Sequence, residues 1–310
     1  MHSNTQLIKQ LAVAMGFDYC GIAQAKELTE DAIRLEQWLH KGYHGEMEYM
    51  AKNFDLRIDP RKLVPGAKSV ICFIKNYYPS EEQEKGIPQI AKYAWGNDYH
   101  EVIRNQLHEF LDQLRKQIGP IEGRGFVDSA PVLERSWAQL AGAGWIGKNG
   151  NLIKPQTGSF FFIATLIVDI ELIYDQPLSK DYCGTCTKCI DACPTQAILP
   201  NKTIEANHCI SYYTIELKKQ SIETPADRSY QDWAFGCDIC QDVCPWNRFS
   251  HPNQEAKFKP IEGLLNMSSE QWLTMEESSF KARFKQSPLL RSKLKGIKRN
   301  IQYLKDQGQS

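Results

Sequence analysis

Three stretches of the chain repeat their apolar residues at helical spacing. Residues 4–17 carry such a stripe on one face, and Gly16 is a typical residue at a helix end. Residues 30–39 and 99–118 show the same period, and the second of these stretches meets Gly119, which precedes a proline. The pattern therefore predicts three helices in the first part of the chain.

Two shorter runs are almost wholly apolar and are predicted to be buried strands. Residues 69–74 follow a Pro-Gly turn signal, and residues 160–170 lie between Gly158 and Asp175. The second run is expected to lie at the centre of its sheet. Because helices and strands are mixed here, residues 1–175 are predicted to form one domain.

The pattern changes after this domain. Residues 181–246 are rich in turns and cysteines, and helical periodicity returns from about Pro260. The apolar anchors of this last part are Phe280, Phe284, Leu289, Leu290, Leu294 and Ile297. The predicted fold class is therefore α+β, with domains of residues 1–175 and 176–255 and a helical segment of residues 256–310.

Composition narrows the class of protein. The 310 residues include 37 basic and 37 acidic side chains, so the overall charge indicates neither a polyanion nor a membrane partner. No run approaches the roughly 18 apolar residues that a membrane helix needs, and the first thirty residues resemble no signal peptide. We expect a cytoplasmic protein that does not associate with membranes.

The cysteine spacing carries the clearest chemistry. The chain has ten cysteines, and the reducing cytosol disfavours disulfides. Cys183, Cys186, Cys189 and Cys193, followed by Pro194, reproduce the C-x2-C-x2-C-x3-C-P pattern of bacterial ferredoxins. In that pattern the fourth cysteine binds a neighbouring cluster, so a second, complementary set is expected.

The second set consists of Cys237, Cys240 and Cys244, which precedes a proline, together with the isolated Cys209. We predict two 4Fe-4S clusters with crossed ligation. The first cluster is assigned to Cys183, Cys186, Cys189 and Cys244. The second cluster is assigned to Cys193, Cys209, Cys237 and Cys240. Two clusters so arranged lie near one another and relay electrons.

Zinc is the alternative to iron and sulfur, because zinc ribbons also use C-x2-C pairs. A zinc site needs four ligands and requires neither the third C-x2-C step nor the prolines, so the cluster interpretation is favoured. Cys20 and Cys72 lie in apolar stretches outside the motif and are expected in the core.

A whole domain precedes the cysteine motif, which indicates catalysis in addition to electron transfer. This domain has neither a G-x-G-x-x-G sequence nor a Walker loop. Its densest polar stretch is 127–135, where Asp128 is predicted to follow a strand and to act as an acid if its surroundings raise its pKa. A helix N-cap is an equally good interpretation of Asp128. The glycines of residues 142–150 permit close approach of the backbone to a bulky ligand.

Together these motifs resemble the epoxyqueuosine reductase family, over about residues 5–303. The resemblance lies in the doubled cysteine motif and in segments 57–61, 65–70, 93–100, 128–135, 147–149 and 287–289. It implies a nitroreductase-like domain that binds cobalamin and a ferredoxin-like domain that supplies electrons. The implied reaction reduces the epoxide of epoxyqueuosine to queuosine at the wobble position of transfer RNA.

The resemblance also assigns residues. Asp128 is then the proton donor to the epoxide oxygen, which would otherwise leave as a poor alkoxide. The implied cobalamin contacts are Arg57, Tyr93, Asp128, Lys148, Asn149, Leu152 and Ser211. Only half of the D-x-H-x-x-G signature of cobalamin proteins is present, since Ile103 stands where Gly is usual. His100 is therefore expected to be a pocket or core histidine and not a cobalt ligand.

The end of the chain is basic. Residues 280–305 contain nine Lys or Arg and no acid, which suits RNA phosphates and, given the resemblance, is favoured over a merely solvated helix face. The predicted tRNA contacts are Lys218, Arg283, Arg291, Lys295, Lys298 and Arg299. The substrate base must be flipped from its stack to be reduced. Many family members carry a further helical-repeat domain after this position, and none is expected here.

Two alternative functions use the same features. A reductive dehalogenase shares cobalamin and two clusters, but usually carries an export signal. An electron-transfer or cobalamin-processing protein leaves Asp128 and the basic end without a purpose. For the reductase, we expect an external donor resembling ferredoxin or flavodoxin, and a monomer.

Overall fold

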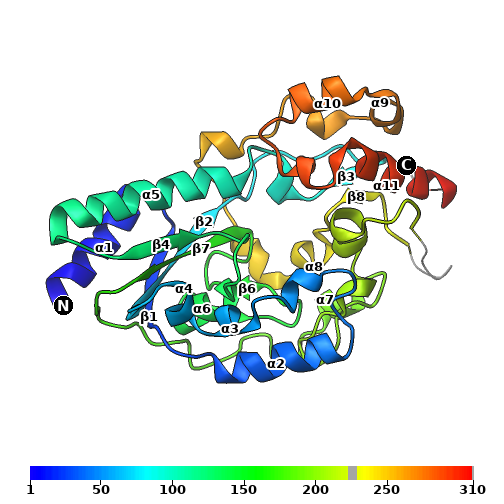
Figure 1. The fold of residues 1–310 in the computed structure, drawn as a ribbon. Helices are drawn as coiled ribbons and strands as arrows, with labels where there is room; N and C mark the ends of the chain where they lie inside the picture. Colours follow the sequence, from blue (N-terminus) through cyan, green and yellow to red (C-terminus); the bar gives the residue numbers. More distant parts are fainter. Residues whose placement is uncertain (223–228, 309–310) are drawn as a thin grey trace.

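The computed structural model describes residues 1–222 and 229–308 (Figure 1). An antiparallel four-stranded sheet crosses its first part, and every neighbouring pair of strands is antiparallel. In spatial order the strands are β1 (Tyr19–Gln24), β2 (Ser69–Asn76), β7 (Phe161–Val168) and β4 (Gly123–Phe126). The predicted strands 69–74 and 160–170 are thus β2 and β7, and both lie inside the sheet.

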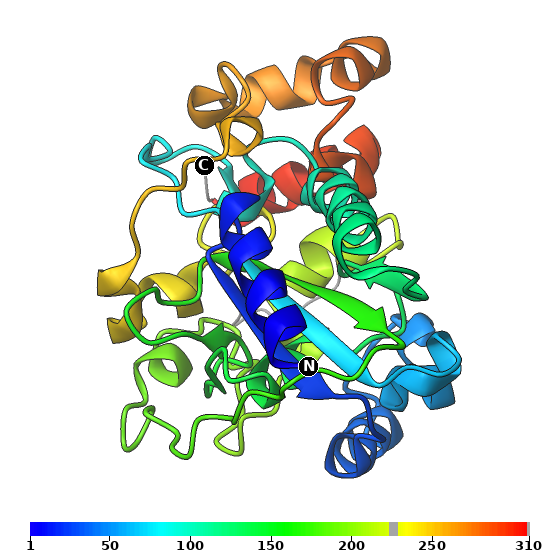
Figure 2. The same cartoon turned by 90° about the vertical axis from the view of Figure 1, so that its left-hand side faces the viewer.

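Helices cover both faces of this sheet, and the strand alternation decides which side chains meet them. Ile71 and Phe73 of β2 pack into one core with α1 (His2–Ala14) and α5 (Tyr99–Ile118). Val70, Cys72 and Ile74 point to the opposite face, where they pack with α6 (Glu134–Leu140). Successive side chains of a strand alternate between faces, so the wholly apolar run of β2 is buried at every position. Figure 2 shows α1 and α5 side by side.

The remaining helices of residues 1–175 are short apart from α2 (Thr29–His40). They are α3 (Phe54–Ile58) and α4 (Pro60–Leu63), and two small strands, β5 (Trp145–Ile146) and β6 (Leu152–Ile153), pair beside α6. The predicted helices 4–17, 30–39 and 99–118 are confirmed as α1, α2 and α5. Gly16, just beyond α1, has a φ of +77°, which glycine adopts at little cost.

A second hydrophobic core unites distant parts of the chain. The strand β3 (Gln89–Ile90) pairs in parallel with β8 (Trp233–Phe235). Ile90 and Trp95 share this core with the C-terminal helices. These helices are α9 (Ser269–Thr274), α10 (Glu277–Arg283) and α11 (Lys293–Asp306). The boundaries predicted at residues 175 and 255 stay a prediction, but this core crosses both.

The cysteine-rich segment is built mainly from turns, as expected, with the short helices α7 (Lys188–Asp191) and α8 (Ile239–Asp242) in contact with each other. Five of the six predicted C-terminal anchors are buried. The prediction for Leu290 is wrong: its side chain is 38% exposed, because the short 3-10 helix Pro288–Arg291 turns Pro288 and Leu289 toward the core instead. Cys72 is buried and Cys20 partly buried against the core, as predicted.

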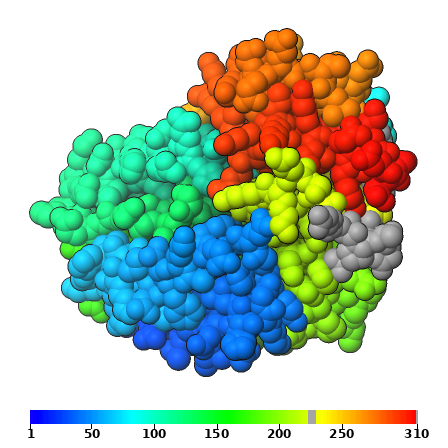
Figure 3. Space-filling model, turned by 45° about the vertical axis from the view of Figure 1, so that its right-hand side comes forward, coloured from blue at the N-terminus to red at the C-terminus, as the bar shows by residue number. Residues whose placement is uncertain are grey.

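In Figure 3 the residues of α2 and the segment after it, the cysteine-rich segment and the C-terminal helices meet on one face of the molecule. No helix within the described residues is both long and apolar enough to cross a membrane.

Candidate active site and cysteine sets

Asp128 lies two residues after the end of β4 in a backbone conformation that is uncommon for a residue with a side chain. Its φ is +54°, in the left-handed region. The Asp128 N–H donates to Glu134 Oε1 at 2.8 Å, which ties this loop to the start of α6. The residue at the N-cap of α6 is Leu133, so the alternative interpretation of Asp128 as a helix N-cap is wrong.

The first turn of α5 supplies the partners of the Asp128 carboxylate. The Tyr99 hydroxyl donates to Asp128 Oδ2 at 2.5 Å, and His100 Nε2 lies 3.3 Å from the same oxygen. The other ring nitrogen, Nδ1, lies 2.7 Å from Asp98 Oδ1. Asp98 also caps α5 by accepting the His100 N–H. We call Asp98, Tyr99, His100, Asp128 and Glu134 the Asp128 network.

The surroundings of Asp128 favour its charged form. Burial acts to raise the pKa of Asp128, but hydrogen bonds from His100 and Tyr99 outweigh it and hold the pKa below its ordinary value. The Asp128 side chain is 62% exposed, which weakens the effect of burial further. The acid role predicted for Asp128 requires a raised pKa. The pKa of Asp128 is lowered instead, so Asp128 is a carboxylate at neutral pH.

The protons of the network reside on its neighbours. Burial lowers the pKa of His100, but its hydrogen bonds to Asp128 and Asp98 raise the pKa to about 9. Burial, together with the charge of Asp128, raises the pKa of Glu134 to about 8. At pH 7 the network thus holds a protonated imidazole and a protonated carboxyl group beside an ionised aspartate.

Further charged and aromatic groups surround Asp128. Tyr49 lies within electrostatic range of Glu216, Arg291, Asp128 and Arg57, and Arg291 pairs with Glu216 at 2.8 Å. Arg57 is buried and donates to the Tyr49 carbonyl, while its Nε has no hydrogen-bond partner. An orphaned buried donor next to exposed Tyr49 fits a site that receives a large polar ligand.

The eight motif cysteines gather into the two predicted sets. Cys189 lies within electrostatic range of Cys183, Cys244 and Cys186. Cys183, Cys186, Cys189 and Cys244 also line one small cavity. In the second set, Cys240 lies within electrostatic range of Cys209 and Cys193, and Cys237 lies within range of Cys240 and Cys209. Cys240 is also within range of Cys189, so the sets are adjacent. Each set fits the ligation of one cluster.

The other predicted cobalamin contacts lie in two places. Tyr93 packs edge to face against Tyr99, with ring centroids 6.0 Å apart, and is therefore next to the Asp128 network. Lys148 donates instead to the carbonyls of Gly184 and Cys186 in the loop of the first set. Asn149 donates to the Cys240 carbonyl in the loop of the second set.

Among the described residues, the structure shows no contact between Asp128 and the last two predicted cobalamin contacts, Leu152 and Ser211. Leu152 is buried in the core beneath α6. Ser211 hydrogen-bonds Cys209 and precedes the π-helix Tyr212–Glu216. Lys148, Asn149 and Ser211 therefore hold the cysteine loops in this structure.

The predicted tRNA contacts also fall into two groups. Lys218, Arg283 and Lys295 are exposed, and Lys298 is half-exposed. Arg291 lies within electrostatic range of Asp128. Arg299 is different: it makes five hydrogen bonds, three of them to the carbonyls of Tyr213, Leu217 and Lys219. The structure gives Arg299 an internal role.

Sequence reasoning missed three residues of the site. Tyr99 and Glu134 bracket Asp128, and Trp145 donates its indole N–H to Cys183 Sγ at 3.4 Å. The position of Tyr99 between Asp98 and His100, at a helix start, was the available signal, because consecutive N-terminal residues of a helix project toward the same end. Nothing in the sequence pairs Trp145 with a cysteine 38 positions later.

Two family models match the chain. Residues 57–129 match the model described as "Epoxyqueuosine reductase QueG, DUF1730", and residues 182–247 match the "4Fe-4S double cluster binding domain". A protein of Cyclobacterium marinum named epoxyqueuosine reductase is 53% identical over 309 residues, which are 99% of this chain and 98% of that protein. The chain belongs to the epoxyqueuosine reductase family.

Solved structures of the family have the same fold. One, with an epoxyqueuosine-modified tRNA-Tyr stem loop, has a TM-score of 0.84 at 28% identity and covers 96% of this chain and 79% of its own. Another, from Bacillus subtilis with its catalytic aspartate loop swung out of the active site, has a TM-score of 0.85 at 28% identity over the same shares. The predicted α+β class is confirmed. A reductive dehalogenase, 16% identical with a TM-score of 0.50, shares the fold alone.

Proposed function

We propose that this protein is an oxidoreductase that reduces the epoxide of epoxyqueuosine in tRNA to the alkene of queuosine. The observation that carries the proposal is the joint presence of the Asp128 network and two adjacent sets of four cysteines in a chain of this family. Reduction of an epoxide to an alkene and water needs two electrons and two protons. The cysteine sets hold the clusters that supply the electrons, and the Asp128 network supplies the protons.

Electrons come through two 4Fe-4S clusters. The matched double-cluster domain, residues 182–247, contains all eight assigned cysteines, and each set has the four thiols that the crossed ligation requires. Since a cluster transfers one electron at a time, two transfers complete each turnover. The electrons originate from an external donor resembling ferredoxin or flavodoxin.

Cobalamin is the proposed partner of the clusters. Arg57, through its orphaned Nε, and Tyr93, beside Tyr99, are the contacts that the structure supports best, with Asp128 nearby. Lys148, Asn149, Leu152 and Ser211 stay proposed contacts, although their present partners lie in the cysteine loops and the core. When bound, cobalamin supplies a low-potential metal centre that can reduce a strained ring.

The residues of the chain deliver the protons. Asp128 is a carboxylate that holds His100 in its protonated form, so the pair carries one proton between His100 Nε2 and Asp128 Oδ2. His100 passes its proton through Asp128, on its exposed loop, to the leaving oxygen, and solvent then reprotonates His100 so that the pair can deliver the second proton. Asp98 fixes the His100 ring from the opposite side, and Glu134 fixes the Asp128 backbone.

The tRNA surface comprises Lys and Arg side chains that are exposed or half-exposed. These are Lys218, Arg283, Arg291, Lys295 and Lys298. Their charges suit phosphate contacts, which position the anticodon and carry no sequence information. Arg291 is within electrostatic range of Asp128, so it lies where the bound RNA meets the site. We further propose a monomer that acts in the cytoplasm.

The decisive experiment is mass analysis of tRNA nucleosides. Anaerobically reconstituted protein with cobalamin, a reductant and tRNA that contains epoxyqueuosine should yield queuosine, and omission of cobalamin should leave the epoxide intact. Persistence of epoxyqueuosine with fully loaded protein would refute the proposed function. Iron analysis of the same sample should give about eight irons per chain, as two cubanes require.

A further inference from the structure

The two cysteine sets have different surroundings. Six of the eight residues of the first loop, 181–188, are exposed. None of residues 205–212, around Cys209 of the second set, is exposed, and Cys209 and Cys237 pack against the second core. The first set therefore faces solvent, and the second is enclosed by protein.

The second set is also the one connected to the Asp128 network. Gly236, which precedes Cys237, lies so close to Tyr93 that an added Cβ would be 3.4 Å from Tyr93 Cε1. Tyr93 in turn packs on Tyr99, the hydrogen-bond donor to Asp128. Electrons that reach the Asp128 network from outside the protein thus enter at the first set and leave from the second.

An unusual surface covers the entry point. Tyr182 is 46% exposed and Phe249 38% exposed, and Trp246 links them with ring centroids 5.9 Å and 6.0 Å away. Beneath them Trp145 contacts Trp246 and donates to Cys183 Sγ. Exposed aromatic side chains that adjoin one another are typical of protein interaction surfaces.

The rim of these aromatic side chains is positively charged. Lys148 and Lys188 line the cavity of the first set together with Tyr182, and the Arg248 guanidinium lies over the Phe249 ring at 4.5 Å. Of the acids in the same loops, Asp181 is paired with Lys202, whereas Asp191 accepts from the neutral Thr187 hydroxyl at 2.7 Å. We call Tyr182, Trp246, Phe249, Lys188 and Arg248 the aromatic–basic patch.

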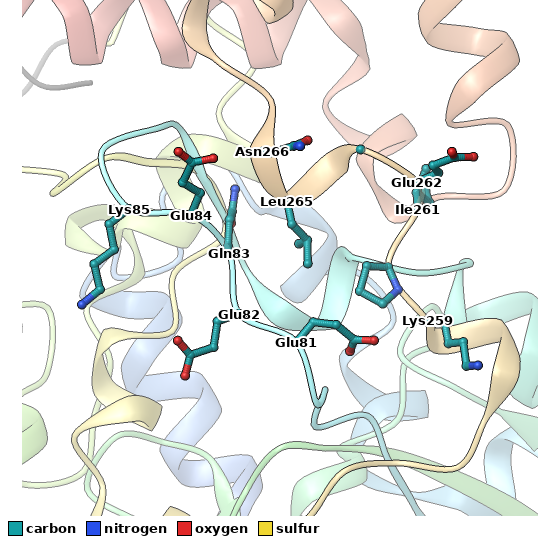
Figure 4. A pocket seen from close by; sticks show the side chains of 12 residues that line it. Glu81, Glu82, Gln83, Glu84, Lys85, Lys259, Ile261, Glu262, Leu265 and Asn266 are labelled. Atoms are coloured by element: carbon teal, nitrogen blue, oxygen red, sulfur yellow. The ribbon is translucent and has the colours of Figure 1, made fainter.

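The charge of this patch contrasts with that of another hollow of the molecule. An open cavity of about 720 Å³ between residues 81–85 and 259–266 is lined by four glutamates and two lysines (Figure 4). That hollow would repel an acidic protein, and none of the motif cysteines lines it.

We propose that the aromatic–basic patch is the docking site of the external electron donor, a small acidic one-electron redox protein. The proposal rests on the proposed function, because it deepens the electron-supply step. In each encounter the donor is oxidised by one electron and the first cluster is reduced by one, with no bond made or broken. Two encounters supply the two electrons that the reduction of one epoxide requires. The contact is expected to be small and transient, with charge setting its association rate.

Stopped-flow absorbance of the iron-loaded protein mixed with reduced flavodoxin tests this directly, since cluster reduction is seen without any turnover of tRNA. The double variant Lys188→Glu with Arg248→Glu should lower the second-order rate constant about tenfold at low salt. A matched variant, Lys26→Glu with Lys116→Glu, changes the net charge equally at exposed sites outside the patch and should leave the rate constant unchanged. Reduction by dithionite should be equal in all three proteins.

Equal rate constants with flavodoxin for the patch variant and the unchanged protein would overturn the proposal. So would a patch variant whose tRNA affinity falls while its reduction by flavodoxin is normal, because the patch would then be an RNA surface. If the patch variant loses iron, the proposal is tested with the unchanged protein instead. Its rate constant for reduction by flavodoxin must fall as the salt concentration rises. A cluster that flavodoxin reduces normally in a protein that fails to make queuosine refutes the proposed function and leaves the docking site standing.

Discussion

The Asp128 network and helix α11 both concentrate charge, but they organise it differently. In the network, His100 contacts both Asp98 and Asp128, and Glu134 and Tyr99 hold Asp128 from two sides. On α11, exposed Lys295 makes no ion pair among the described residues, whereas the cation of Arg299 donates to several neighbouring carbonyls. Coupled charges shift one another's pKa and act as a unit, whereas separated cations act independently.

The largest effect is expected from Asp128→Asn. Asparagine tolerates the left-handed backbone and keeps the shape, but it cannot carry the proton, so epoxide reduction should fall at least about 100-fold. Single-turnover formation of queuosine, followed by mass analysis, measures this. Iron and cobalamin contents should stay unchanged. Near-normal turnover would show that Asp128 is not the proton donor.

His100→Gln should reduce turnover about 10- to 100-fold, because the network then lacks the group that supplies the proton to Asp128. In the unchanged protein, His100 is protonated below its pKa of about 9, so turnover should decline as the pH rises through that value. The variant should lose this alkaline limb of its pH profile. An identical limb in both proteins would assign it to another group, such as Glu134.

Arg299→Lys tests the internal role of Arg299, whose Nε, Nη1 and Nη2 all donate hydrogen bonds. Lysine cannot reach the carbonyls of Tyr213, Leu217 and Lys219 together, so about 1–3 kcal/mol of stability should be lost. For a chain of this size the Tm should fall by several degrees. Scanning calorimetry at a fixed rate, with Lys295→Gln as the control, checks it. A normal Tm with weakened tRNA binding would restore Arg299 to the RNA surface.

The smallest effects are expected from Lys295→Gln and Lys298→Gln. Each change should weaken tRNA binding by about two- to fivefold and lower the slope of log affinity against log salt by about 1. The two effects should add in the double variant, because the side chains share no partner within the described residues. Fluorescence anisotropy with a labelled anticodon stem loop at several salt concentrations measures them. Strong non-additivity would remove the contrast with the Asp128 network.

Local patterns predicted much of this fold and one half of the site. The spacing around Cys183 and Cys237 was informative because cluster ligation is a local geometric demand, and cysteines within each set lie within electrostatic range of one another. Helix α5 was predictable from its periodicity and its Gly119 end. Each of these signals is contained in a few consecutive residues.

The rest depended on contacts between distant segments. The pKa of Asp128 is set by α5, and the role of Arg299 by carbonyls about 80 positions away. A sequence gives the number of charges on a segment but not their partners, so it does not distinguish the internal Arg299 from the exposed Lys295. The prediction for Leu290 failed for a different, local reason, because one 3-10 turn decided which side chains face the core.

The short ladder between β3 and β8 limits how this enzyme could be rearranged by engineers. Residues 89–90 form one strand of it and residues 233–235 the other, and Tyr93 and Cys237 follow the two strands by only a few positions. A transplant of the cysteine-rich segment into another scaffold would carry half of this ladder and only a portion of the core around it. The cysteine-rich segment therefore cannot be transferred as an independent unit, and the junctions of chimaeric proteins should lie outside residues 89–304.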